Sequence, residues 1–171
     1  MKKILIATVF TIKCFASFHT INQFEADFTQ KIIDDNNKTI VYKGHIQASK
    51  PQFALWKYTN PIQKQIYIMD NRVIIIEPEL EQAIYKKMDA SFNFFTMINN
   101  AKKITKNVYE AKFREKRFFI VTDDNTIKSI TYHDDFDNKI IIEFKNEVIN
   151  RKIPQEVFEA VIPNDFDVIR E

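Results

Sequence analysis

Two kinds of hydrophobic periodicity divide the chain. Apolar residues recur at intervals of three and four between Ile21 and Ile32, behind a capping-box spacing at Thr20 and Gln23. This pattern predicts an amphipathic helix that ends near the polar residues 34–37. From residue 39 onward the period changes to two, which predicts β-strands.

Alternation in the first half predicts a meander of five strands after this helix. A short turn at Asp70-Asn71 joins two of them, because Asp and Asn tolerate the positive φ of a tight hairpin. The expected strands cover residues 40–48, 53–58, 65–69, 72–77 and 82–87.

The second half predicts one more helix and further strands. Residues 89–101 carry apolar side chains on more than one helical face, so this helix must be sandwiched or must cover something apolar. The expected strands cover residues 108–113, 117–122, 127–132, 139–145 and 157–162. About ten strands without βαβ alternation predict a mainly β single domain built on one curved antiparallel sheet.

The N-terminus has the pattern of a secretory signal peptide. A basic start at residues 1–3 and an apolar run at residues 4–12 precede small residues suited to cleavage before Ser17. We expect residues 1–16 to be removed and residues 17–171 to be exported. The alternative is a buried N-terminal strand or helix. Cleavage removes three lysines and no acidic residue, so the formal net charge changes from +2 to −1.

Cysteine and glycine supply exclude several classes of protein. Cys14 is the only cysteine and Gly44 the only glycine among 171 residues, which excludes a thiolate zinc site, a disulfide scaffold, a phosphate loop and a dinucleotide fingerprint. Cys14 is also a candidate lipidation site, but Lys13 directly before it fits that processing poorly. The small net charge argues against nucleic-acid binding.

No catalytic or metal-binding constellation stands out. The three histidines are scattered, and no nucleophile pairs with a base by spacing. The acidic run from His133 to Asp137 lacks the Gly and Glu of a calcium loop, whose positions hold Ile140 and Asn146 counted from Asp135. A hairpin turn explains this run. We therefore expect no enzyme, no cofactor and no metal site.

The sequence feature left to explain is its large number of apolar positions. A sheet with one apolar face and two Phe-rich helices either buries a conventional core or lines a cavity for an oily ligand. Periodicity alone leaves both interpretations open.

The order of several motifs resembles the LolA family of periplasmic outer-membrane lipoprotein carrier proteins. The segment Phe24–Gln30 is similar to the family's helix motif, and Gly44 falls where that family has a glycine. Similar segments follow in the same order over nearly all of residues 17–171, at residues 42–46, 50–58, 61, 70–71, 78, 82, 127–144 and 158–168.

This resemblance implies an incomplete, open β-barrel covered by a helical lid. It implies a monomeric chaperone that accepts acylated lipoproteins from an inner-membrane ABC transporter and passes them to an outer-membrane receptor. Lys50, where the family has arginine, would contact the lid. The acyl cavity would be lined by Phe24, Phe28, Ile46, Leu55, Trp56, Ile66, Ile68, Phe92, Phe95, Ile142 and Phe144.

Two other functions fit the same pattern. One is the lipidated outer-membrane receptor of that pathway, which has a similar fold. The other is a non-catalytic periplasmic sensor or scaffold domain that binds a protein partner through an open sheet edge. For each cavity residue, ordinary core packing is the competing interpretation.

Overall fold

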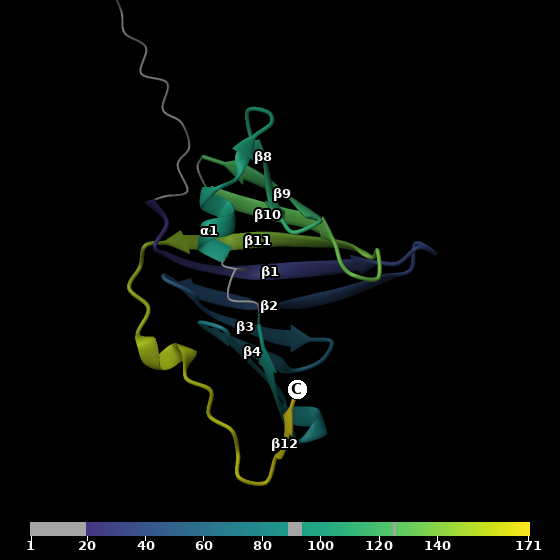
Figure 1. Cartoon of the computed structure of the whole chain (residues 1–171), viewed down its shortest axis with the longest axis vertical. Helices are drawn as coiled ribbons and strands as arrows, with labels where there is room; N and C mark the ends of the chain where they lie inside the picture. Colours follow the sequence, from purple (N-terminus) through teal and green to yellow (C-terminus); the bar gives the residue numbers. More distant parts are fainter. Residues whose placement is uncertain (1–19, 89–93, 125) are drawn as a thin grey trace, which may run out of the picture.

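The computed structural model describes residues 20–88, 94–124 and 126–171. They form one strongly curved sheet of twelve strands in the order β12-β6-β5-β4-β3-β2-β1-β11-β10-β9-β8-β7 (Figure 1). The sheet stays open, because β12 and β7 at its two ends have one neighbour each. All neighbours are antiparallel except β12 and β6, which pair in parallel.

The first six strands are β1 (Gln23–Ile33), β2 (Thr39–Ser49), β3 (Phe53–Asn60), β4 (Lys64–Met69), β5 (Arg72–Glu77) and β6 (Gln82–Lys87). The others are β7 (Lys102–Lys103), β8 (Val108–Phe113), β9 (Lys116–Asp123), β10 (Thr126–His133), β11 (Lys139–Ile149) and β12 (Asp167–Arg170). The described helices are α1 (Phe94–Asn99) and two short 3-10 helices, η2 (Pro78–Leu80) and η3 (Gln155–Phe158).

The prediction of a helix at residues 21–32 was wrong, because this segment forms the central strand β1. Phe24, Phe28 and Ile32 are spaced by four residues, which is a multiple of the strand period as well as close to one helical turn. The strand pairs along its length with β2 on one side and β11 on the other. The hydrogen bonds of these two ladders stabilise the strand more than the local capping box at Thr20 and Gln23 would stabilise a helix.

The five-strand meander after residue 39 is confirmed as β2 to β6. The turn at Asp70-Asn71 also forms as expected, with Asp70 at a φ of 55°. In the second half, four predicted strands are confirmed as β8 to β11. The acidic run after His133 is a hairpin turn, in which Oδ1 of Asp134 accepts hydrogen bonds from the backbone N–H groups of Phe136 and Asn138.

The strand predicted at residues 157–162 was wrong. The segment packs on the sheet through some of its side chains and adds no strand to it: Phe158 ends the 3-10 helix η3 and is buried, and Ile162 packs on the outer face of the sheet. The last strand is β12, which joins the edge of the sheet beside β6.

Of the predicted second helix, the structure describes α1 and the residues after it. This α1 is the one α-helix within the described residues, and it is short. The structure therefore contains an open curved sheet and a single helix against it, where two covering helices were predicted. Residues 1–16 and 89–93, including Phe92, lie outside the described residues.

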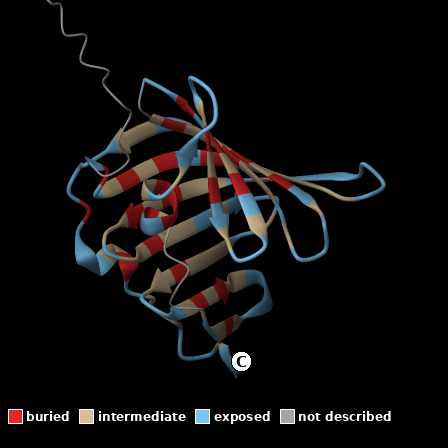
Figure 2. Cartoon of the chain, turned by 45° about the horizontal axis from the view of Figure 1, so that its top comes forward, coloured by how far each residue is buried: buried red, intermediate tan, exposed pale blue. Residues whose placement is uncertain are grey.

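Apolar side chains form a cluster on each face of the sheet, and the two clusters differ in size. The larger cluster lies on the inner, concave face and packs β1, β2, β10 and β11 against α1, with Phe24, Ile98 and Ile120 fully buried (Figure 2). A smaller cluster around Tyr67 and Ile74 lies on the other face of β4 and β5. The C-terminal segment between η3 and β12 covers this second cluster.

Candidate functional site

A cavity of about 250 Å³ lies between α1 and the inner face of the sheet. Strands β1 to β4 and β9 to β11 supply one wall, and Phe94, Phe95 and Met97 of α1 supply the other. Its lining is mostly apolar, with Gln30, Gln52 and two tyrosines as the polar members. Such a surface suits an oily ligand, because each apolar group it covers is removed from water.

Strand alternation selects which side chains reach the cavity. On β3, Ala54, Trp56 and Tyr58 face inward and line it, because successive side chains point to opposite faces of a sheet. Leu55 points the other way and packs on the second cluster. It therefore lies away from the cavity that it was predicted to line.

Six residues predicted from the sequence are brought together around this cavity. Five of them come from the sheet and one from α1. That these residues hold acyl chains stays a prediction. The six are Ile46, Trp56, Ile66, Ile68, Phe95 and Ile142.

Three further predicted residues lie in the core beside the cavity. Phe24 and Phe28 come from β1, not from a helix, and Phe144 comes from β11. The ring of Phe28 lies 5.0 Å from the ring of Trp56, and the ring of Phe24 lies 5.3 Å from that of Phe144, both edge to face. These rings support the cavity wall without lining it.

Lys50 follows β2 at the rim of the sheet. Its Nζ donates a hydrogen bond to Oδ1 of Asn22 at 3.1 Å, and its backbone N–H donates to the Asn22 carbonyl at 2.8 Å. Lys50 also borders a cleft shared with Phe53 and residues of the segment 152–158. Its contact with a lid remains a prediction.

Sequence reasoning missed the polar residues of the cavity. Tyr58 donates a hydrogen bond from Oη to Oε1 of Gln30 at 2.8 Å, and Tyr132 lines the same cavity from β10. Burial, with the nearby Tyr132 and Tyr42 hydroxyls, holds the pKa of Tyr58 well above its ordinary value. A period-two analysis of β1 would have found Gln30, because Phe28, Gln30 and Ile32 are two residues apart and therefore share the inner face.

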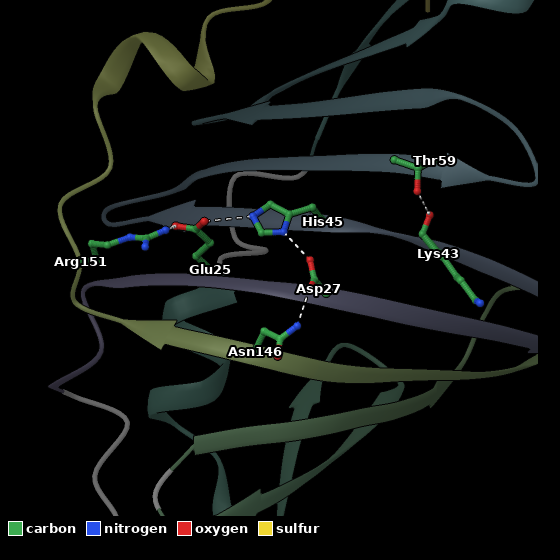
Figure 3. A network of polar contacts seen from close by, with 7 residues as sticks. All are labelled: Glu25, Asp27, Lys43, His45, Thr59, Asn146 and Arg151. Atoms are coloured by element: carbon green, nitrogen blue, oxygen red, sulfur yellow. Dashed lines mark hydrogen bonds and ion pairs between the residues drawn. The ribbon is translucent and has the colours of Figure 1, made fainter.

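A polar network lies on the outer face, opposite the cavity (Figure 3). His45 contacts two carboxylates: Nδ1 lies 2.8 Å from Oδ1 of Asp27, and Nε2 lies 3.2 Å from Oε1 of Glu25. Arg151 binds the other Glu25 oxygen, and Asn146 donates to Asp27. The network therefore ties β1 to β2, to β11 and to the start of the C-terminal segment.

Both carboxyl groups of this network have shifted pKa values. Hydrogen bonds from His45 and Asn146 lower the pKa of Asp27 below its ordinary value of 3.8. Burial alone would raise the pKa of Glu25, but Arg151 and His45 outweigh it and lower that pKa below 4.5. Within the described residues, no cluster of three or more His, Cys, Asp or Glu side chains is arranged to hold a metal ion.

The fold and cavity define a class of protein: an open, strongly curved β-sheet around an apolar cavity. A solved LolA-superfamily structure from Nitrosomonas europaea has this fold, with a TM-score of 0.52 at 9% identity over 85% of this chain and 94% of that one. An uncharacterized conserved protein from Thermus thermophilus gives a TM-score of 0.55 at 8% identity over 88% and 91% of the two chains.

Sequence comparison identifies the family. Residues 19–116 match the family described as outer membrane lipoprotein carrier protein LolA, and the chain belongs to this family. A protein of Campylobacter jejuni named outer-membrane lipoprotein carrier protein is 38% identical over 99% of both chains. A protein of the same name from Wolinella succinogenes is 33% identical over 100% of both chains.

Among the residues that the structure describes, none of the helices has the length and apolar character needed to span a bilayer.

Proposed function

We propose that this chain carries lipoproteins, with their acyl chains held in the cavity between α1 and the sheet. The observation that supports this most directly is the mostly apolar lining of that cavity in a chain related over its full length to named lipoprotein carriers. Nothing in the described part of the chain points to catalysis, and a carrier needs none.

The free energy of lipid transfer explains why a carrier is needed. Each methylene moved from water to an apolar environment is stabilised by about 0.8 kcal/mol. An acylated protein is therefore held at a membrane unless another apolar surface covers its chains. The cavity offers such a surface, and release then requires that it open again.

We propose further that α1 acts as the lid. At about 250 Å³ the cavity is smaller than the roughly 300–1,000 Å³ of sites that take drug-sized ligands. Two or three acyl chains therefore require it to widen. The side chains of Phe94, Phe95 and Met97 form the wall that is not part of the sheet, so movement of α1 would widen it without breaking strand pairing.

Export and transfer complete the proposal. Residues 1–16 would direct the chain to the periplasm and be removed there. The carrier would take lipoproteins from an inner-membrane ABC transporter and deliver them to an outer-membrane receptor, acting as a monomer. Lys50 would contact the lid in the closed form.

Native mass spectrometry of the protein purified from periplasm tests this proposal. The sample is incubated with one lipoprotein in its acylated form and in an acyl-free form. We expect a one-to-one complex with the acylated form alone. The mass of the unbound protein should correspond to a chain that begins at Ser17. Equal binding to both forms, or binding to neither, would contradict the carrier function and favour a scaffold domain. A diacylated Cys14 would instead indicate the receptor.

A further inference from the structure

One end of the apolar cavity carries a group of polar side chains. Gln30, Tyr58 and Tyr132 line the cavity from β1, β3 and β10 and are all half-buried. Gln52 lies at the other end of β3, six residues before Tyr58. Polar residues on the inner face of a β-sheet are uncommon enough to need an explanation.

Strand register brings this group together. Gln30 lies opposite Tyr42 on β2 and opposite Ile142 on β11, and Ile142 in turn lies opposite Ile130, two residues before Tyr132. The ring of Tyr42 contacts the ring of Tyr58 edge to face at 5.9 Å. The group therefore spans five neighbouring strands at the end of the inner face nearer the β1–β2 and β10–β11 hairpins.

The hydrogen-bonding capacity of this group is only partly used. The Tyr58 hydroxyl donates to the amide oxygen of Gln30, which leaves the two amide N–H groups of Gln30 available. Within the described residues, neither those N–H groups nor the Tyr132 hydroxyl donates a hydrogen bond. Burial and the nearby Asp134 raise the pKa of Tyr132, so its hydroxyl stays protonated and able to donate.

Neutral donors beside an apolar cavity match one part of a lipid. The ester carbonyls that join acyl chains to a glyceryl unit are uncharged acceptors next to hydrocarbon. When the chains enter the cavity, those carbonyls leave water, and an unpaired buried carbonyl is unfavourable. A donor at the end of the cavity removes that penalty.

We propose that Gln30 and Tyr132 form a subsite for the ester carbonyls of a bound diacylglyceryl group. This inference rests on the proposed function and adds an orientation to it. The acyl chains would lie against Trp56 and Ile68, and the glyceryl unit would lie at the Gln30 end. The attached protein would then leave the cavity on the side of the two hairpins.

A pair of lipopeptides tests the subsite. One carries a diacylglyceryl cysteine with ester-linked chains, and the other carries the same chains in ether linkage, without carbonyls. We expect wild-type protein to bind the ester form about 3- to 10-fold more tightly, the range expected for one hydrogen bond. Tyr132→Phe and Gln30→Met should each weaken ester binding and leave ether binding unchanged.

Tyr67→Phe is the matched control. The Tyr67 hydroxyl donates to Gln65 at 2.7 Å, and its ring belongs to the cluster on the outer face. This variant should bind both lipopeptides as wild type does. Thermal unfolding of each variant identifies any that are misfolded, and the conservative Tyr132→Phe keeps the test valid if Gln30→Met is unstable.

Three results would overturn the subsite. Equal wild-type affinity for the two lipopeptides would do so while leaving cavity binding intact, and an equal loss of both affinities in Tyr132→Phe would show a packing role. A third arm measures binding of an anionic phospholipid. The Nζ atom of Lys64 lies 5.0 Å from the centroid of the Tyr58 ring. If phospholipid binding depended on Lys64 and not on Gln30, the site would be one for a charged headgroup. If wild type bound neither lipopeptide, the carrier proposal itself would fail.

Discussion

The ring of Phe28 occupies the space that a side chain at Gly44 would need. These two residues lie directly opposite each other in the β1–β2 ladder. A Cβ atom on Gly44 would lie 2.7 Å from Cζ of Phe28 and 2.2 Å from the carbonyl oxygen of Lys57. The only glycine of the chain is therefore required by packing, since its φ is not positive.

Gly44→Ala should destabilise the fold strongly. The added methyl group overlaps a backbone oxygen as well as a ring, so β2 must shift, and we expect a loss of about 1–3 kcal/mol or more in the free energy of unfolding. Urea denaturation measures it, with the exposed Lys43→Ala as control. Adding Phe28→Leu should restore only part of the loss, because the overlap with Lys57 remains. Full rescue would contradict the role of that backbone contact.

Ile68→Glu should abolish acyl binding and leave the secondary structure intact. Ile68 lines the cavity and is only partly buried, so the carboxylate has access to solvent when the cavity is empty, but it opposes entry of an acyl chain. Lipopeptide binding and far-UV circular dichroism are measured together. Thr59→Glu on the exposed outer face is the matched control. Collapse of the dichroism signal would assign Ile68 to the core instead.

Phe158→Ala should loosen the C-terminal segment. Phe158 is 2% exposed, and its ring centroid lies 5.8 Å from that of Phe53. Truncating a buried phenylalanine costs about 3–5 kcal/mol, so this anchor should be lost. Hydrogen exchange should accelerate at the amide of Asp167, which donates to Glu81, more than in β1. Val161→Ala, at an 83% exposed position, should change nothing. Uniform acceleration would show global destabilisation.

Acid should weaken the outer-face network. Because the pKa values of Asp27 and Glu25 are lower in the folded protein, the unfolded chain takes up protons first as the pH falls. Their contribution to stability is complete above the ordinary values of 3.8 and 4.5 and is lost as the pH falls through the folded values.

Urea denaturation between about pH 5 and pH 3 measures this loss. The free energy of unfolding should fall less steeply for Asp27→Asn and Glu25→Gln than for wild type. Equal slopes for all three proteins would show that the two carboxylates do not couple to folding. A matched control is Asp124→Asn, at an exposed turn position.

Most strands were predictable because each displays its own alternation. Strands β2 to β6 and β8 to β11 followed from local pattern, and Asp and Asn marked the turns at residues 70–71, 123–124 and 134–138. The identity of β1 did not follow, since it depends on pairing with β11, more than a hundred residues away in the chain. The C-terminal residues 157–162 likewise look like a strand, but Ala160 and Ile162 pack on the outer cluster instead.

The candidate site, like the fold, was predictable from the sequence only in part. The resemblance pointed to Ile46, Trp56 and Ile142, and these three side chains line the cavity in the structure. Leu55 and Trp56 are adjacent in one strand, so they lie on opposite faces and do not share a cavity wall. Gln30 was missed because its segment was assigned to a helix, although period two places it on the same face as Phe28 and Ile32. Tyr132 was missed because a polar residue in a sequence is first assigned to the surface.

The location of the acyl chains is the central claim, and Trp56 reports on it directly. It is the only tryptophan of the chain and it lines the cavity. A lipopeptide with brominated acyl chains should quench Trp56 fluorescence at the concentration that forms the one-to-one complex, while the unbrominated form shifts the emission to shorter wavelength. A complex that forms without quenching would put the chains outside the cavity and contradict the account.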